Sequence, residues 1–443
     1  MKIEIESKKL IKPSAPTVDH LRKLKISFID QFQLPIYIGV IFFYSSKNDV
    51  HYPSFVPISE RFRLLEKALR ETLTLFYPLA GRYVEEKCLV ECDDQGVEFL
   101  EAKADGTLDQ FLHGETDPDD VLSHLATQPH QMDLIGSPLV VVQMTTFTCG
   151  GMAVGLHISH RIADMHTISS FLSTWMMACR GSIQKAIHPC FDLSSIFPPR
   201  DLPKLKPPVG QMIGAKNVMK RFVFDSQSIA KLKAVAKRGG FDSKKEPSRV
   251  ELVTALLSIA LLDVAKLKNG QSKPFLVAHM VNLRGRTDLL SHQNSCGNLY
   301  MPVLWKSAVE VKRHGLHGLV ALMRDAITIS LAKLANAIDK EDLDEIMMHL
   351  MREFQEELQK GDADVLLFTS WCRFLLHRVD LGWGEPEFVS SLCSPFDLVT
   401  LMDHKEGDDD GGVVAQVSLT EDDMDLFCKQ HDILQYASHK WRA

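Results

Sequence analysis

Apolar residues along the chain alternate between helix-like and strand-like spacing. From Ser59 to Phe76 they recur every three or four positions, which predicts a helix capped by Ser59 and ended by Pro78. A second pattern with this spacing predicts a helix through Phe171 and Trp175. Short apolar runs, typical of buried strands, lie at 97–100, 139–144 and 152–158.

The second half of the chain shows the same alternation. Ser248 and Glu251 form a capping-box pattern that opens a long apolar helix ending near Lys266. Thr420 is expected to cap the last helix, which should end near Tyr436. Further predicted elements are strands at 275–283 and 413–419 and a helix at 315–336. Since strands and helices alternate in both halves, we expect an α/β protein.

A proline-rich segment separates the two halves. Five prolines between 198 and 208 exclude a helix and remove the backbone donors that a central strand would need. At 443 residues the chain is also longer than most single domains. We therefore predict an N-terminal domain over 1–196, a crossover linker over 197–220 and a C-terminal domain over 221–443.

Composition narrows the class of protein. The chain is 45% hydrophobic and 24% charged, and its longest apolar run, 36–44, is too short to cross a bilayer. The N-terminal residues lack the apolar core of a secretory signal, so we expect a cytoplasmic protein without membrane contact. Nine cysteines, never spaced as Cys-x-x-Cys, fit free thiols better than disulfides or a zinc site.

The charge distribution is uneven. A net charge of −7 argues against a nucleic-acid partner. The segment 204–249, in contrast, holds twelve Lys and Arg residues against three Asp and Glu residues. Two interpretations of this basic segment stay open: a solvated face, or a contact surface for a small polyanionic ligand.

Histidine carries the strongest candidate chemistry. Nucleophile-elbow, dinucleotide, P-loop and His-Glu-x-x-His patterns are absent from the sequence. His160 follows an apolar strand and precedes an apolar helix, with Asp164 four positions later. An imidazole at such a place is half-buried and can act as a base near neutral pH. Other His-x-x-x-Asp pairs stand in loops or beside proline: His113/Asp117, His188/Asp192 and His404/Asp408.

Two other interpretations of this segment remain. On local sequence alone, His160 fits a satisfied core histidine as well as it fits a catalytic base. A zinc site would need His157, His160, Asp164 and His166 to converge, whereas alternation along the strand and turn points them apart. We therefore expect no metal site.

Two further segments combine residues that could carry chemistry. Asp380 precedes Gly382, Trp383 and Gly384 in a pattern typical of a tight structural turn, in which an arginine could anchor the carboxylate. Arg284 and Arg286 follow a predicted strand, and whichever of the two is buried needs a carboxylate partner.

Together these segments resemble the two signatures of the plant BAHD acyltransferases, which transfer acyl groups from coenzyme A thioesters to alcohols or amines. The first signature matches His160 to Asp164, and the second matches Asp380 to Gly384. Segments that extend the resemblance over nearly the whole chain are Lys12–Thr17, Asp30-Gln31, Phe76–Arg82, Ser248–Glu251, Asn282–Arg284, Gly297-Asn298 and Ser370–Arg373. Val218–Phe224 and Cys149–Gly151 are most similar to the alkaloid-acetyltransferase branch that contains vinorine synthase.

Two positions depart from the family pattern. Met165 stands where the family usually has glycine, and Leu381 stands where it usually has phenylalanine. Leu381 loses side-chain volume but no catalytic group. Met165, a flexible side chain beside the expected base, is expected to reshape the acceptor pocket.

The resemblance implies a fold and a set of roles. It implies two chloramphenicol-acetyltransferase-like α/β domains with mixed β-sheets flanked by helices, joined by the long crossover loop, with an active-site channel between them. His160 is then the general base, and Asp164 supports its loop, with Arg284 as the expected partner. The residues expected to support the second signature are Asp380, Gly382, Trp383 and Gly384.

The resemblance also implies ligands. Acyl-CoA, most simply acetyl-CoA, is the expected co-substrate with no tightly bound cofactor, and a small-molecule alcohol is the expected acceptor. An alkaloid is the first expectation for that acceptor, with a terpenoid or phenolic alcohol as the alternative. Ser248, Arg249 and the basic segment are expected to contact the coenzyme phosphates, since Ser248 opens a helix. Met165 and Trp371 are expected in the acceptor pocket, and the protein is expected to be a monomer.

Two interpretations from other classes stay open. The chain could be a binding protein of this fold that has lost catalysis, although intact His160 and Asp164 argue against it. It could also be a condensation-type domain of a peptide assembly line. The second signature and the lack of a carrier domain argue against that interpretation.

Overall fold

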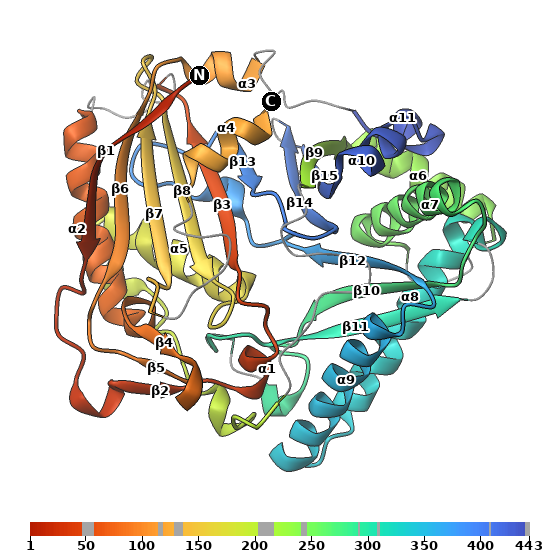
Figure 1. Cartoon of the computed structure of the whole chain (residues 1–443), viewed down its shortest axis with the longest axis horizontal. Coiled ribbons are helices and arrows are strands. Elements are labelled where there is room, and N and C mark those ends of the chain that lie inside the picture. The colour runs from red at the N-terminus through yellow and green to blue at the C-terminus, as the bar shows by residue number, and fades with distance from the viewer. Residues whose placement is uncertain are drawn as a thin grey trace.

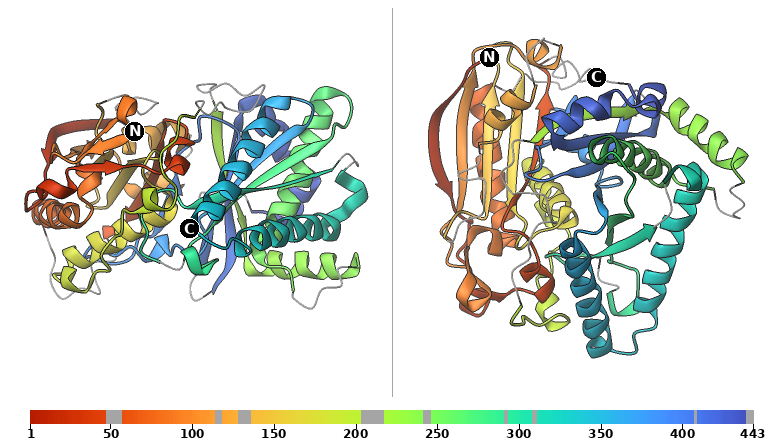
Figure 2. Two further views of the ribbon diagram at one scale, coloured as in Figure 1. Left: turned by 90° about the horizontal axis from the view of Figure 1, so that it is seen from below. Right: turned by 45° about the vertical axis from the view of Figure 1, so that its right-hand side comes forward.

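Two six-stranded β-sheets lie side by side and form the frame of the molecule (Figures 1 and 2). The second half of the chain forms one sheet, and the first half forms the other together with one strand from the second half. The structure is a computed structural model and describes residues 1–46, 57–113, 118–127, 136–202, 217–240, 246–290, 293–307, 311–406 and 409–438. The middle of the predicted linker, residues 203–216, lies outside the described residues. The fold is the two-sheet α/β architecture expected from the sequence.

The first sheet is mixed, because β6 and β7 pair in parallel while its other neighbours pair antiparallel. Its strands, in spatial order, are β1 (Ile3–Ile11), β6 (Val97–Ala104), β7 (Val140–Thr146), β8 (Met152–Ser159), β3 (Tyr37–Tyr44) and β13 (Phe388–Ser391). A small antiparallel sheet below it consists of β2 (Lys23–Lys25), β5 (Leu89–Glu91) and β4 (Arg82–Val84).

The second sheet is mixed as well, since β12 pairs in parallel with both of its neighbours. Its strands, in spatial order, are β11 (Tyr300–Ser307), β10 (Phe275–Asn282), β12 (Asp364–Ser370), β14 (Leu398–Glu406), β15 (Asp409–Thr420) and β9 (Asn217–Phe224).

The α-helices cover the faces of both sheets. In the first half these are α1 (Phe28–Gln31), α2 (Ile58–Leu75), α3 (Leu108–His113), α4 (Pro118–Leu125) and α5 (Met165–Cys179). In the second half they are α6 (Ser226–Arg238), α7 (Arg249–Asn269), α8 (Val311–Ala335), α9 (Lys340–Lys360), α10 (Glu421–Cys428) and α11 (His431–Tyr436).

Strand β3 shows how one sheet serves two hydrophobic clusters. Val40 and Phe42 pack with the apolar faces of α2 and α5, whereas the alternate residues Ile41 and Phe43 pack with α3 and α4. This period of two is the alternation that a strand buried on both faces requires.

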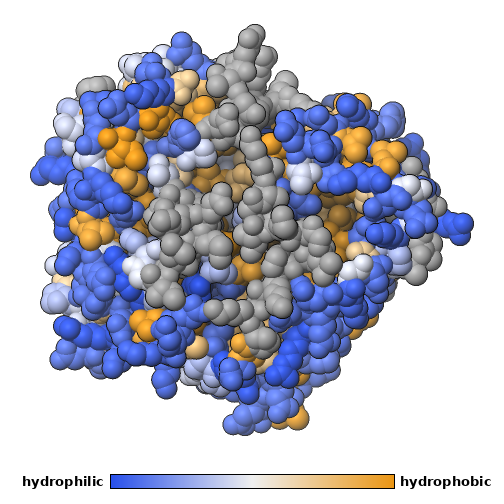
Figure 3. Space-filling view, in the orientation of Figure 1, coloured by the Kyte–Doolittle hydropathy of each residue, from blue (hydrophilic) through white to orange (hydrophobic). Residues whose placement is uncertain are grey.

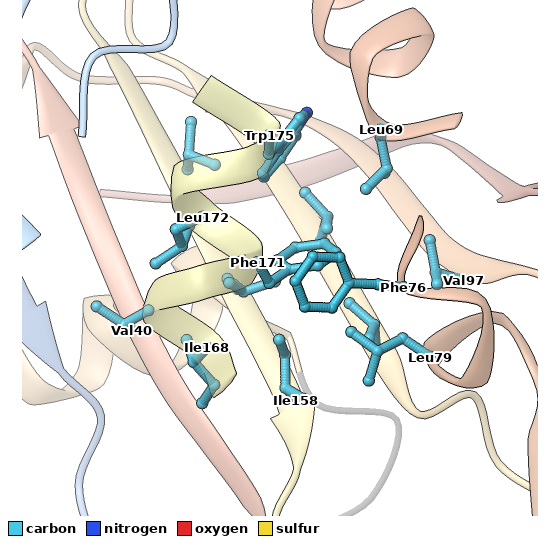
Figure 4. Close-up of a cluster of buried hydrophobic side chains, with 14 of the residues drawn as sticks. Val40, Leu69, Phe76, Leu79, Val97, Ile158, Ile168, Phe171, Leu172 and Trp175 are labelled. Carbon is cyan, nitrogen blue, oxygen red and sulfur yellow. The ribbon is translucent and has the colours of Figure 1, made fainter. Parts of the chain in front are cut away.

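Helix α5 is held firmly against the first sheet. Figure 4 shows Phe171 and its neighbours on α5 meeting side chains from α2, β8 and the turn after α2. The Phe171 ring meets the Phe76 ring edge-on, with centroids 5.5 Å apart, and Trp175 Nε1 donates to the carbonyl of Leu65 at 3.1 Å. The start of α5, directly after the His160 segment, therefore rests on a packed core.

Several predicted elements are confirmed, and two helix predictions were wrong. Ser248 and Glu251 form the predicted capping box at α7, and Thr420 caps α10. The N-cap of α2 is Pro57 rather than Ser59, so the hydroxyl of Ser59 does not cap the helix. The predicted last helix is broken between α10 and α11. Helix α9 and strand β1 were not predicted.

Strand β13 crosses from one half of the chain to the other. It belongs by sequence to the predicted C-terminal domain, yet it pairs antiparallel with β3 and completes the first sheet. A division of the chain into two consecutive halves does not describe this exchange.

The Asp380–Gly384 segment fastens this crossover. One oxygen of Asp380 accepts from the backbone N–H of Gly382 at 2.8 Å and of Gly384 at 2.9 Å, and the other oxygen pairs with Arg180. Both glycines have φ near +110°, which side chains with a Cβ rarely adopt. The predicted arginine anchor is thus Arg180 at the end of α5.

Trp383, between those glycines, inserts into the first-half core. Its ring meets that of Tyr44 edge-on at 5.9 Å, and the guanidinium of Arg61 lies over it at 5.3 Å. The second signature is therefore a structural turn that attaches the second half to the first sheet.

On the face in Figure 3, hydrophilic side chains dominate over both halves and apolar ones are scattered among them. Among the described residues, no helix is both long and apolar enough to pass through a bilayer.

Candidate active site

A cavity of about 770 Å³ lies between the two sheets. The first half lines it with the start of β3, α4 and the turn from His160 to α5. The second half lines it with β10, β12, β14 and α9, together with the segment 391–396 that follows β13. Its volume is in the usual range for sites that bind small molecules.

His160 stands at the end of β8, at the wall of this cavity. Its backbone N–H donates to the carbonyl of Ile36 at 2.9 Å, and its own carbonyl accepts from Asn298 Nδ2 at 2.7 Å. Burial lowers the pKa of the imidazole below 6.5, although the negative charge of Asp164 acts in the opposite direction. His160 therefore places an imidazole that is uncharged near neutral pH at the cavity wall, on a backbone that these two hydrogen bonds hold in place.

Asp164 turns its carboxylate toward the second half of the chain. Its oxygens accept from Arg284 at 2.7 and 3.3 Å and from the backbone N–H of Leu299 at 3.1 Å. As the N-cap of α5 it also accepts from the backbone N–H and hydroxyl of Thr167. The predicted Asp164–Arg284 pair is present, and these contacts fix the backbone beside His160 rather than its imidazole.

Arg284 is completely buried and fully hydrogen-bonded. Besides Asp164 it donates to the carbonyls of Ser295 at 2.7 Å and Gly297 at 3.0 Å and to Asn282 Oδ1 at 3.1 Å. A buried guanidinium needs partners for its donors, and this one has them.

A second hydrogen-bond network joins the two halves of the chain, and the sequence did not predict it. Asp30 Oδ1 accepts from both the backbone N–H and Nδ2 of Asn298 at 2.8 Å, and Asn298 Nδ2 also holds the carbonyl of His160. Ser27 donates to the other oxygen of Asp30. The segments Asp30-Gln31 and Gly297-Asn298 contribute to the family resemblance, but no local sequence pattern connects one with the other.

Met165 and Trp371 both line the cavity, as do Tyr300 and His166. The imidazole of His166 contacts the ring of Phe374 edge-on at 6.2 Å. Whether Met165 and Trp371 contact an acceptor stays a prediction. Tyr300 and the segment 391–396 were not predicted, because no local pattern marks them.

Ser248 and Arg249 lie at the start of α7 and do not line the described cavity. The hydroxyl of Ser248 accepts from the backbone N–H of Glu251, while Arg249 pairs with Asp403 and donates to the carbonyl of Gly412 at 2.8 Å. Both side chains therefore have structural partners, and their contact with coenzyme A stays a prediction.

The four residues of the zinc interpretation have different neighbours. His157 is buried against the ring of Tyr37, Asp164 pairs with Arg284, and His166 Nε2 lies 2.8 Å from the carbonyl of Gln293. Within the part of the chain that the structure describes, no three His, Cys, Asp or Glu residues are placed to hold a metal ion.

Comparison with known proteins identifies transferases as the relatives of this chain. The model of the family described as "Transferase family" matches residues 1–434. An acetyl-CoA-benzylalcohol acetyltransferase of Clarkia breweri is 39% identical, with 99% of this chain and all of that protein covered. Vinorine synthase of Rauvolfia serpentina is 32% identical over 95% of each chain.

Solved structures of other proteins have the same fold as this chain. The crystal structure of vinorine synthase has a TM-score of 0.82 at 29% identity and full coverage of both chains. F. sporotrichioides TRI101 complexed with coenzyme A and T-2 shares the fold, with a TM-score of 0.70, 18% identity and coverage of 94% and 99%. The expected narrower similarity to the vinorine-synthase branch is not supported, since the benzylalcohol acetyltransferase is the more similar of the two relatives.

Replacing Asp164 with asparagine should mainly destabilise the fold. The change leaves the buried Arg284 without its counter-charge, which costs roughly 3–5 kcal/mol, so we expect a lower melting temperature and residual activity in the soluble fraction. Thermal unfolding monitored by fluorescence measures this, with the exposed Asp201→Asn as the matched control. An unchanged melting temperature together with complete inactivity would instead assign Asp164 to orienting the base.

Proposed function

Because the chain belongs to the plant BAHD acyltransferases, we propose that it transfers an acetyl group from acetyl-CoA to a hydroxyl of a small specialised metabolite. The observation that carries this proposal is the uncharged imidazole of His160 at the wall of a cavity shared by both halves. The family match over residues 1–434 gives no support to the assembly-line condensation interpretation.

The reaction needs a base and no covalent enzyme intermediate. Neutral His160 removes the proton of the acceptor hydroxyl as its oxygen attacks the thioester carbonyl. The resulting tetrahedral oxyanion collapses, an ester forms, and the carbon–sulfur bond breaks. The departing coenzyme A thiolate then receives the proton from His160, which regenerates the neutral base.

The proposed identities of the donor and of the acceptor rest on different observations. Relatives that are named as acetyltransferases favour acetyl as the acyl group. For the acceptor, the sequence motifs favoured an alkaloid, whereas the 39% identical relative is named for benzyl alcohol. We propose a small alcohol within this range. The cytoplasmic location and the monomeric state expected from the sequence stay predictions.

The coenzyme phosphates are proposed to lie outside the cavity, near α6 and the start of α7. Three described lysines of the basic segment, Lys231, Lys233 and Lys237, are exposed on α6. Arg221 of the same segment is buried instead, with its guanidinium over the ring of Phe388 at 5.0 Å. The surface available to phosphates is therefore smaller than the sequence count suggested.

His160→Ala should abolish acetyl transfer. Loss of a general base costs at least ~100-fold in kcat, while the melting temperature and acetyl-CoA affinity should stay near those of the unmodified enzyme. Steady-state kinetics and calorimetric titration measure these quantities, with His188→Ala as the surface control. Retention of more than a tenth of turnover would contradict the role. An inactive binding protein of the same fold predicts no transfer even before the substitution.

The pH profile of kcat/KM should reflect a base with a lowered pKa. The active form is the neutral imidazole, so activity is retained as the pH falls through 6.5 and is lost only as the pH passes the lower pKa of His160. Initial rates at limiting acceptor concentration measure this profile. An acidic limb centred above 6.5 would show that the titrating base is not the buried His160.

Neutralising the exposed lysines of α6 should affect the donor alone. The triple variant Lys231→Gln, Lys233→Gln, Lys237→Gln should raise the KM for acetyl-CoA several-fold at low salt, and added salt should reduce the difference because exposed charges are screened.

Ser248→Ala tests the nearer contact and should act on the same KM with little change in kcat. A matched triple of exposed lysines, Lys23 and Lys25 on β2 and Lys87 in the turn between β4 and β5, serves as control for the α6 triple. Equal donor KM values at low salt in all variants would support the solvated-face interpretation.

A further inference from the structure

The part of the cavity wall that the structure describes carries almost no charge. Among the described residues that line it there is no Lys, Arg or Glu, and Asp164 is the one carboxylate. The remaining polar groups are hydroxyls, amides and imidazoles, including Thr369, Ser370 and Asn282. Such groups can satisfy the hydrogen bonds of a neutral ligand but cannot neutralise an ionised one.

Asp164 does not give the cavity wall an uncompensated negative charge. Its charge is compensated by Arg284, at 2.7 Å between Nη1 and Oδ2, and its oxygens are further occupied by N–H and O–H donors from Thr167 and Leu299. A cationic ligand in the cavity would therefore meet an ion pair without net charge rather than a free carboxylate.

Two of the three described imidazoles that line the cavity, those of His160 and His166, agree with this low charge. Burial lowers the pKa of both His160 and His166, and for His166 the positive charge of Arg284 contributes in the same direction. Positive charge is thus disfavoured at two separate points of the cavity wall.

Resting on the proposed acyl transfer, we infer that the acceptor of this enzyme is an alcohol without an ionised group. An ammonium or carboxylate on the acceptor would lose its water shell on entering the cavity, and the described lining residues offer it no uncompensated opposite charge. Aromatic and terpenoid alcohols meet this condition. An alkaloid meets it only in its unprotonated form.

Four para-substituted benzyl alcohols of similar size test the inference with the unmodified enzyme and acetyl-CoA. The substituents are isobutyl (neutral), dimethylaminomethyl (protonated at neutral pH), trimethylammoniomethyl (permanently charged) and carboxylate. Near pH 7 we expect kcat/KM for the neutral alcohol to exceed that of each charged alcohol by at least ~100-fold, as an unpaired buried charge implies.

The pH dependence separates charge from shape. Raising the pH deprotonates the dimethylamino alcohol, so its kcat/KM should rise toward that of the isobutyl alcohol. The trimethylammonium alcohol cannot lose its charge and should stay poor at every pH. A tertiary amine cannot form a stable amide, so ester formation is the single reaction followed, by chromatography of the product.

A matched pair of variants tests the reverse change. Met280 lines the cavity from β10 and has no role in the proposed chemistry. Met280→Asp should raise kcat/KM for the trimethylammonium alcohol relative to the isobutyl alcohol at least ~10-fold, and the uncharged Met280→Asn should not. If Met280→Asp fails to fold, the four-alcohol series on the unmodified enzyme still decides.

The outcomes distinguish failure of this inference from failure of the proposed acyl transfer. Charged alcohols within threefold of the neutral one, or preferred over it, would overturn the inference while the acyltransferase function stands. Absence of ester formation with benzylic and terpenoid alcohols alike, with acetyl-CoA and longer acyl-CoA donors, would overturn the proposed function and the inference with it.

Discussion

The buried ion pair between Asp164 and Arg284 is the interaction on which the arrangement of the site depends. Two charges taken out of water are costly unless each has its partner and its remaining hydrogen bonds. Here the guanidinium also satisfies carbonyls of the 295–297 segment, and the carboxylate also caps α5. One pair thereby joins the first turn of a helix in one half to a strand end in the other.

The backbone of His160 is held from three sides. The α5 cap fixes the residues after it, the carbonyl of Ile36, just before β3, accepts its N–H, and Asn298 holds its carbonyl. Asn298 is in turn held by Asp30, from the other half of the chain. A general base has to lie within hydrogen-bond reach of the proton it removes, so a fixed backbone is what the proposed chemistry requires.

The sequence predicted the features that depend on residues close together in the chain. Strand β8, helix α5 and the capping box at α7 follow from periodicity and capping within a few residues. The cost of an unpaired buried charge predicted that Arg284 or Arg286 needs a carboxylate, and the family resemblance singled out the pair of Arg284 with Asp164. The Asp30–Asn298 contact spans 268 positions and leaves no periodic trace. The cavity-lining segment 391–396 has no regular pattern either. Its place depends on β13 joining the distant β3, which only the folded chain decides.

The exchange of β13 has a consequence for how the chain can be divided. Without it, β3 would become an edge strand whose sequence, Tyr-Ile-Gly-Val-Ile-Phe-Phe-Tyr, is almost wholly apolar. An exposed edge of that kind is a template for pairing with other chains. The first sheet is therefore complete only when both halves are present, and we expect a first half produced alone to self-associate through β3.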